Sequence, residues 1–176
     1  MTDAPVAPDA DDEYDKLRRR VLWKLPTGLY VLGSRDGERR NGMTISLVMQ
    51  VSSGPTKLVA AAVLKDAFTH ELMEAGGVFG LSLLDREDRA IVRKFVKPVE
   101  VDAAAMTLNG FPFHDGPVTG APILDQSVAW LDCRITSGVD CGDHTLFLGE
   151  VVGAGFLKDE ATAVLRMEDT RMNYGG

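Results

Sequence analysis

The feature that most constrains the fold is a two-residue alternation of side chains over Met43–Ser52. One set, expected to be the buried apolar face, consists of Met43, Ile45, Leu47, Met49 and Val51. The opposite set consists of Thr44, Ser46, Val48, Gln50 and Ser52. A period of two is that of a β-strand with one face against a core. Gly28–Arg35 precedes this strand across a turn rich in glycine and charge, so the two segments predict a β-hairpin.

Strands also dominate the pattern predicted for the rest of the chain. Short apolar or alternating runs predict strands at Lys57–Leu64, Val78–Leu84, Val128–Ser137, His144–Gly155 and Ala163–Glu168. Helices are expected at Asp11–Leu25, at Ala67–Ala75 with Asp66 as N-cap, and after Asp85, where Ile91, Val92 and Phe95 share a face. The glycine- and proline-rich segment Asn109–Pro122 is predicted to be a loop or an excursion from the barrel.

This order of elements selects the fold class. A doubly wound parallel sheet is excluded because it needs a helix after nearly every strand. The seven predicted strands are mostly joined by turns instead, with two short internal helices. We therefore expect a mainly β protein, a closed or nearly closed antiparallel β-barrel with short helices inserted.

The charge is concentrated at the N-terminus. The chain of 176 residues has a net charge of −7, and its first 15 residues hold six acids and no base. Residues 1–12 are predicted to be a disordered acidic tail, 13–170 one domain and 171–176 a C-terminal tail. The nearly neutral body argues against nucleic-acid binding. The longest apolar run, Leu58–Leu64, is too short to span a membrane. With no export signal and two cysteines expected to be reduced, a cytoplasmic protein is predicted.

Metal and nucleophile chemistry have no support in the sequence. His70, His114 and His144 lack the paired spacing of metal ligands, and no Cys-x-x-Cys motif is present, so no metal site is expected. Cys133 alternates with apolar residues and is interpreted as a small core side chain. No nucleophile elbow or Walker-type loop occurs.

Two polar features have both a structural and a functional interpretation. Thr44, Ser46 and Gln50 form either the solvent side of a half-buried strand or a hydrogen-bonding wall for a planar ligand. Lys65 and Thr69, at the start of a predicted helix, are either a solvated lysine and a routine helix residue or a phosphate site. The residues alone leave both alternatives open.

Several ordered segments resemble the flavin reductase-like, FMN-binding split-barrel family. They are LPTGLYVL (25–32), GMTIS (42–46), KDAFTHEL (65–72), FGLSLL (79–84), GAPIL (120–124), AWLDC (129–133) and GDHTLFLGEV (142–151). The resemblance covers about residues 20–155 and also extends to the flavin reductase modules of some flavodiiron proteins.

The resemblance implies a split β-barrel that forms a homodimer and binds FMN or FAD. It implies an NAD(P)H:flavin oxidoreductase that takes a hydride from NADH or NADPH and supplies reduced flavin to a partner monooxygenase. One alternative is an electron-transfer flavoprotein that binds FMN tightly without NAD(P)H turnover. The other is a split barrel that has lost its cofactor and serves as a scaffold.

The same resemblance assigns roles to individual residues. His144 is placed near the nicotinamide as the catalytic residue. Tyr174 either belongs to a flexible tail or folds over the cofactor. The flavin site is assigned to Thr27, Asn41, Met43, Thr44, Ser46, Lys65, Thr69 and Phe95. Many relatives carry paired serines and an arginine where this chain has Asp66, Ala67 and Phe68, so the flavin type stays open.

Overall fold

Two antiparallel sheets form the body of the protein in the computed structural model, which describes residues 10–172. The elements are α1 (Ala10–Leu22), β1 (Tyr30–Asp36), β2 (Arg39–Ile45), β3 (Val48–Gln50), β4 (Leu58–Leu64), α2 (Phe68–Gly76), β5 (Val78–Leu83), η1 (Ile91–Phe95), β6 (Val101–Asp102), β7 (Thr107–Leu108), β8 (Phe111–Asp115), β9 (Pro122–Leu124), β10 (Ala129–Asp140), β11 (His144–Phe156) and η2 (Met167–Asp169). None of the helices within these residues is long and apolar enough to cross a membrane.

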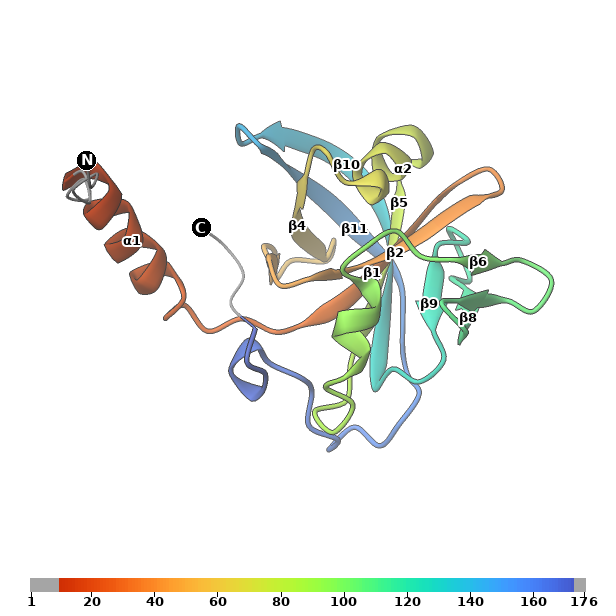
Figure 1. Cartoon of the computed structure of the whole chain (residues 1–176). Helices are drawn as coiled ribbons and strands as arrows, with labels where there is room; N and C mark the ends of the chain where they lie inside the picture. The colour runs from red at the N-terminus through yellow and green to blue at the C-terminus, as the bar shows by residue number, and fades with distance from the viewer. Residues whose placement is uncertain (1–9, 173–176) are drawn as a thin grey trace, which may run out of the picture.

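The larger sheet has seven strands in the order β2-β1-β5-β10-β11-β4-β3. Its two edge strands, β2 and β3, follow each other in the chain and are separated only by Ser46 and Leu47. The sheet therefore curls so that its two edges come close at this two-residue break, and Figure 1 shows the curled sheet. This arrangement confirms the predicted mainly β fold and the nearly closed antiparallel barrel.

The break at Ser46 corrects the predicted strand over Met43–Ser52. Ile45 is buried, but Leu47, Met49 and Val51, predicted to share its buried face, are exposed. The chain leaves one edge of the sheet at Ile45 and joins the other at Val48, so a single alternation cannot place both halves against one core.

The helices differ from the predictions mainly at their ends. Helix α1 ends at Leu22 rather than Leu25, and Figure 1 shows it apart from the barrel. Helix α2 has Ala67 at its N-cap position without a side-chain hydrogen bond, so the prediction of Asp66 as the cap was wrong. Gly77, at φ +67°, ends this helix, because a residue without Cβ adopts the left-handed conformation without strain.

The segment Asn109–Pro122 is not only a loop, because it contains strand β8 and ends at the first residue of β9. Both strands belong to a small sheet of order β6-β7-β8-β9. A tight turn with positive φ at Asn109 and Gly110 joins β7 to β8, and these turn residues conceal the short strands flanking them. The strand predicted at Ala163–Glu168 is reduced to two isolated bridges, Gly28 with Arg166 and Asp85 with Val164.

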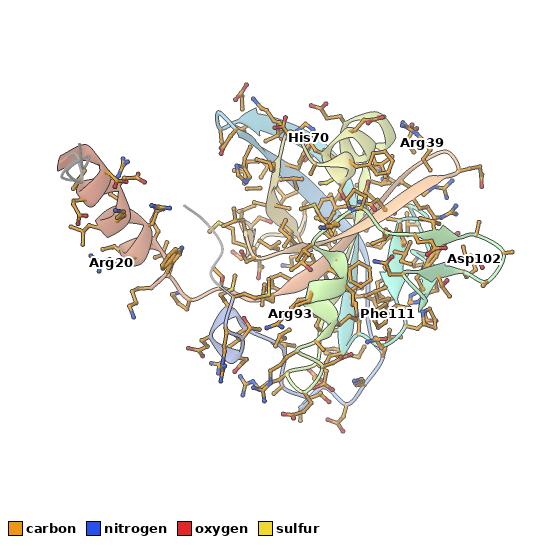
Figure 2. The ribbon with its side chains drawn as sticks, viewed as in Figure 1. Arg20, Arg39, His70, Arg93, Asp102 and Phe111 are labelled. Atoms are coloured by element: carbon orange, nitrogen blue, oxygen red, sulfur yellow. The ribbon has the colours of Figure 1, made fainter. Side chains whose placement is uncertain are left out.

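Strand β1 separates two buried cores. Leu32 belongs to the barrel core with Ile45, Phe79 and Phe147, among others. Its neighbour Val31 points to the other side, because successive strand residues face opposite ways. There it joins an outer core that includes the three predicted apolar residues of η1, namely Ile91, Val92 and Phe95. Phe111 of β8, which is labelled in Figure 2, packs against this core. Its ring centroid lies 5.7 Å from that of Phe95.

Some predictions fall partly on segments that are not described. Residues 1–9 of the predicted acidic tail and residues 173–176 of the predicted C-terminal tail lie outside the described residues, as does Tyr174. Helix α1 begins at Ala10, within the segment predicted to be the tail.

Candidate functional site

A pocket of about 360 Å³ lies between β2, the start of α2 and the segment that follows η1. We refer to it as the β2–α2 pocket. Its lining residues are Asn41, Met43, Thr44, Leu64, Asp66, Ala67, Phe68, Thr69, Phe95, Val96, Lys97, Pro98 and Met172. This volume is in the range of small-molecule sites, and its walls are mostly apolar with a few polar groups.

The N-terminus of α2 forms the polar end of the pocket. Strand β4 ends at Leu64, and the chain turns through Lys65–Ala67 before the helix begins at Phe68. The Ala67 N–H donates to the Leu64 carbonyl at 3.0 Å, which fixes this turn. The first N–H groups of a helix have no acceptor within it, and the helix dipole makes this end positive. This end of the pocket therefore favours an anion.

Side-chain hydrogen bonds of β2 hold the two walls of the pocket in place. Asn41, only 3% exposed, donates from Nδ2 to Thr69 Oγ1 at 2.7 Å, and its Oδ1 accepts from the Val99 N–H at 3.0 Å. Thr44 donates from Oγ1 to the Val92 carbonyl at 2.5 Å. Strand β2 is thus tied both to α2 and to the segment around η1.

The structure brings together many of the residues assigned to the flavin. Asn41, Met43, Thr44, Thr69 and Phe95 all line the β2–α2 pocket, although they come from three separate elements. The fold brings these residues together although they are far apart in the sequence, because β2 lies beside both α2 and η1. Of the three residues of the predicted polar row, only Thr44 lines this pocket, and Gln50 belongs to β3.

Other assigned residues lie elsewhere. Ser46 is buried at the break between β2 and β3, and it does not line the pocket. Thr27 lines a separate pocket of about 530 Å³, together with Trp23, Tyr30 and Arg166. Met172 lines both pockets, so the two are neighbours.

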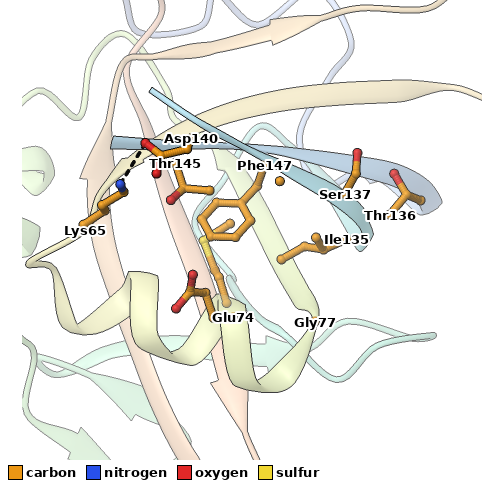
Figure 3. A pocket seen from close by; sticks show the side chains of 11 residues that line it. Lys65, Glu74, Gly77, Ile135, Thr136, Ser137, Asp140, Thr145 and Phe147 are labelled. Atoms are coloured by element: carbon orange, nitrogen blue, oxygen red, sulfur yellow. Dashed lines mark hydrogen bonds and ion pairs between the residues drawn. The ribbon is translucent and has the colours of Figure 1, made fainter. Parts of the chain in front are cut away.

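Lys65 faces a third pocket, of about 710 Å³, between α2 and the β10–β11 hairpin. Figure 3 shows its ammonium paired with Asp140 at one end, near Thr145 and Phe147. The Lys65–Asp140 hydrogen bond lowers the pKa of the Asp140 carboxyl. The lysine assigned to the flavin phosphate is therefore engaged in a pocket other than the one that Thr69 lines.

His144, at the start of β11, does not itself line the β2–α2 pocket, whereas the neighbouring Leu64 of β4 does. It is the cross-strand partner of Leu64, and paired residues share one face of a sheet. Its Nδ1 lies 2.8 Å from Asp143 Oδ1, a hydrogen bond that lowers the pKa of the Asp143 carboxyl. Its Nε2 is buried and has no hydrogen-bond partner among residues 10–172. A buried ring nitrogen without a partner is a group that a bound molecule would satisfy.

The family assignment rests on residues 22–175, which match the model of the flavin reductase like domain. The chain belongs to the flavin reductase-like family. The resemblance seen in the sequence segments is thereby confirmed. The NADH-dependent FAD reductase of Streptomyces globisporus is 36% identical over 155 residues, covering 85% of this chain and 82% of the relative.

Solved structures support the same membership. The NADH:FAD oxidoreductase of Streptomyces globisporus superposes with a TM-score of 0.74 at 32% identity, covering 94% of this flavin reductase-like chain and 93% of that one. The styrene monooxygenase flavin reductase of Pseudomonas putida S12 gives 0.69 at 28% identity, covering 84% and 90%. Some relatives are much longer. The chain spans 22% of a Nostoc protein whose name describes a diflavin flavoprotein, with 34% identity over 134 residues.

The residues of the β2–α2 pocket fit a flavin. Met43, Leu64 and Phe95 offer apolar surface for a planar ring, while Thr69 and the α2 N-terminus offer donors for a phosphate. Asp66 is an acid in the same pocket, and Lys97 supplies an opposite charge. Leu64, Val96 and Met172 were missed in the sequence, because an apolar residue that lines a pocket has no signal distinct from a core residue.

Metal chemistry has no site in the described part of the protein. Among residues 10–172 there is no group of three or more His, Cys, Asp and Glu side chains that could hold a metal ion. His70, the most buried of the histidines, contacts Thr145 Oγ1 through Nε2 at 2.8 Å, and its ring packs on Phe147. Its position beneath the third pocket is explained by packing.

Proposed function

We propose that this flavin reductase-like protein is an NAD(P)H:flavin oxidoreductase that reduces FMN or FAD in the β2–α2 pocket. The observation that carries the proposal is a pocket with apolar walls and one end formed by a helix N-terminus. Family membership supports the reaction class. Relatives named as NADH-dependent flavin reductases support the choice of donor and acceptor.

The protein's contribution to this reaction is binding and orientation. A bound flavin supplies the chemistry, because it accepts a hydride, two electrons with a proton, from the nicotinamide, which leaves as NAD(P)⁺. Met43, Leu64 and Phe95 exclude water from one side of the site. Thr69 and the α2 N-terminus hold a phosphate, and His144 Nε2 offers a hydrogen bond to a carboxamide beside the pocket.

Steady-state oxidation of NADH and NADPH, followed by absorbance with FMN or FAD added, tests the proposal. We expect turnover that depends on both protein and flavin. The control omits added flavin. A protein that uses free flavin as its substrate then oxidises the nucleotide only at the background rate, whereas a protein that keeps a tightly bound flavin still oxidises it faster than background. No flavin-dependent oxidation with either nucleotide and either flavin would overturn the proposed function.

The reduced flavin is proposed to pass to a monooxygenase. This step is supported by relatives that are themselves named as reductase components, such as that of styrene monooxygenase. In the absence of an oxygenase, reduced flavin reacts with oxygen, so we expect hydrogen peroxide to accumulate. We also propose a cytoplasmic location, since a reductase of this kind needs a supply of NAD(P)H.

We propose in addition that the protein forms a homodimer through the edge of β3. Leu47, Met49 and Val51 are exposed side by side at this edge, and Met49 is 63% exposed. Unpaired sheet edges with exposed apolar residues favour association. Light scattering after size exclusion is expected to give the mass of two chains. Met49→Asp is expected to shift the mass toward one chain, while Gln50→Asp, an exposed neighbour, serves as the control.

A further inference from the structure

The orientation of the Asn41 amide is fixed by a backbone group. The Val99 N–H can only donate a hydrogen bond, so the atom that faces it at 3.0 Å must be the Oδ1 oxygen of Asn41. The other end of the amide, Nδ2, therefore faces Thr69 Oγ1 at 2.7 Å. Exchange of the two ends would place Nδ2 against the Val99 N–H, two donors facing each other, and the bond to Val99 would be lost.

This orientation determines what the Thr69 hydroxyl can do. Its oxygen accepts from Asn41, so its hydrogen is not used in that bond. Among the described residues, the hydroxyl hydrogen has no protein acceptor. Thr69 is 1% exposed, in the first turn of α2, and it lines the β2–α2 pocket. The hydroxyl is therefore a donor whose remaining direction is toward the pocket.

We propose that Asn41 is a positioning residue that keeps the Thr69 hydroxyl as a hydrogen-bond donor toward the phosphate of a flavin. The inference rests on the proposed function, because it takes the flavin phosphate as the anion at the α2 N-terminus. Phosphate oxygens accept hydrogen bonds and do not donate them at neutral pH. A Thr69 hydroxyl with its lone pairs toward the phosphate would repel it. Asn41 prevents that arrangement without touching the flavin.

Asn41→Asp reverses the hydrogen bond with almost no change of shape. One carboxylate oxygen still accepts from Val99, and the other now accepts from the Thr69 hydroxyl, which uses up its hydrogen. We expect the Kd for FMN to rise about tenfold or more, in line with the loss of a hydrogen bond to a charged group. Riboflavin lacks the phosphate, so its Kd is expected to change less than about twofold. Quenching of flavin fluorescence measures both constants.

The new charge of the aspartate needs a control of its own. Asn41→Ala is uncharged and leaves Thr69 free to rotate, so we expect a smaller loss confined to FMN. In Thr69→Val the hydroxyl is absent, and Asn41→Asp added to that variant is expected to weaken FMN little further. An equal factor for Asn41→Asp with and without the hydroxyl would show that charge alone acts and would overturn the inference. Thr69→Ser keeps the hydroxyl that Thr69→Val lacks, so it is expected to keep the preference for FMN over riboflavin.

The outcomes separate this inference from the proposed function. Wild-type protein that reduces flavin but binds FMN and riboflavin equally leaves the reductase intact and overturns the role of Asn41. An unchanged ratio of the two Kd values in Asn41→Ala and Asn41→Asp overturns it as well. Circular dichroism checks that each variant is folded. If Asn41→Asp does not fold, Asn41→Ala and the Thr69 variants decide the result through the same ratio.

Discussion

Lys65 Nζ lies 2.9 Å from Asp140 Oδ1, so the lysine that follows β4 is held at the tip of the β10–β11 hairpin. This ion pair turns the ammonium toward the third pocket (Figure 3). In contrast, Lys97 lines the β2–α2 pocket and forms no ion pair within the described chain.

A matched pair of lysine variants tests which cation attracts the flavin phosphate. Lys65→Gln and Lys97→Gln remove the same charge, so long-range effects on an anionic ligand are similar in both. We expect Lys97→Gln to raise the Kd for FMN several-fold at low salt, and Lys65→Gln to change it less. Because exposed charges are screened, the difference is expected to shrink at high ionic strength. A larger effect of Lys65→Gln would assign the phosphate to the lysine predicted from the sequence.

Substitution of His144 is expected to affect the nicotinamide nucleotide more than the flavin. The unpartnered Nε2 belongs to a residue that shares a face of the sheet with Leu64 of β4, which lines the pocket. His144→Phe removes the polar nitrogen, so we expect the KM for NADH to rise about tenfold, the effect of a lost hydrogen bond. The Kd for FMN, measured without NADH, should stay within a factor of two. His144→Gln keeps a polar side chain that can bond a carboxamide and is the control, while weakened FMN binding in His144→Phe would contradict the placement.

The sequence predicted the barrel because most strands carry their pattern locally. The uniformly apolar sequence of β4, for example, is a property of that segment itself. The break at Ser46–Leu47 is different, because it depends on where the curled sheet meets its own edge. The small sheet escaped prediction for another reason. Strands of two or three residues, such as β7, are too short to show a period.

Only part of the candidate site was predicted from the sequence. The residues that the structure brings together in one pocket are those whose position depends on their own segment. Thr44 and Thr69 lie in segments that carry the family resemblance, Asn41 directly precedes one of them, and the structure places all three in one pocket. Lys65 belongs to such a segment as well, but its direction is set by Asp140, which lies 75 residues away. A long side chain at a turn takes its direction from whichever opposite charge the fold brings near. The direction of the Lys65 side chain therefore cannot be predicted from the residues next to it in the sequence.

The two cysteines are expected to differ in reactivity because only one reaches solvent. Cys141 is exposed in the hairpin turn, whereas Cys133 is buried. Burial, together with the neighbouring Asp132 charge, raises the pKa of the Cys133 thiol from 9.0 to about 12. At pH 8 we expect one thiol per folded chain to react with a disulfide reagent, and two after denaturation. Rapid reaction of two thiols in the folded protein would contradict the burial of Cys133.

The same raised pKa predicts a loss of stability at alkaline pH. Between pH 9.0 and about 12 the thiol ionises in the unfolded chain but stays protonated in the folded one. The unfolded state then binds fewer protons, so the free energy of unfolding falls as the pH rises through this range. Cys133→Ala lacks the group and should show a shallower fall. Urea titrations at several pH values compare the two slopes, and parallel slopes would contradict the shift.

Gly33 is expected to be irreplaceable because β1 and β9 approach each other closely at this point. A Cβ atom on Gly33 would lie 2.1 Å from the carbonyl oxygen of Pro122, a backbone atom that cannot move aside without displacing β9. We expect Gly33→Ala to lower the free energy of unfolding by about 2 to 3 kcal/mol, as overpacking of a core does. Gly54→Ala is the matched control, because a Cβ there meets no atom within 4 Å. Urea unfolding measures both variants, and equal midpoints would show that β9 is not packed against β1 as described.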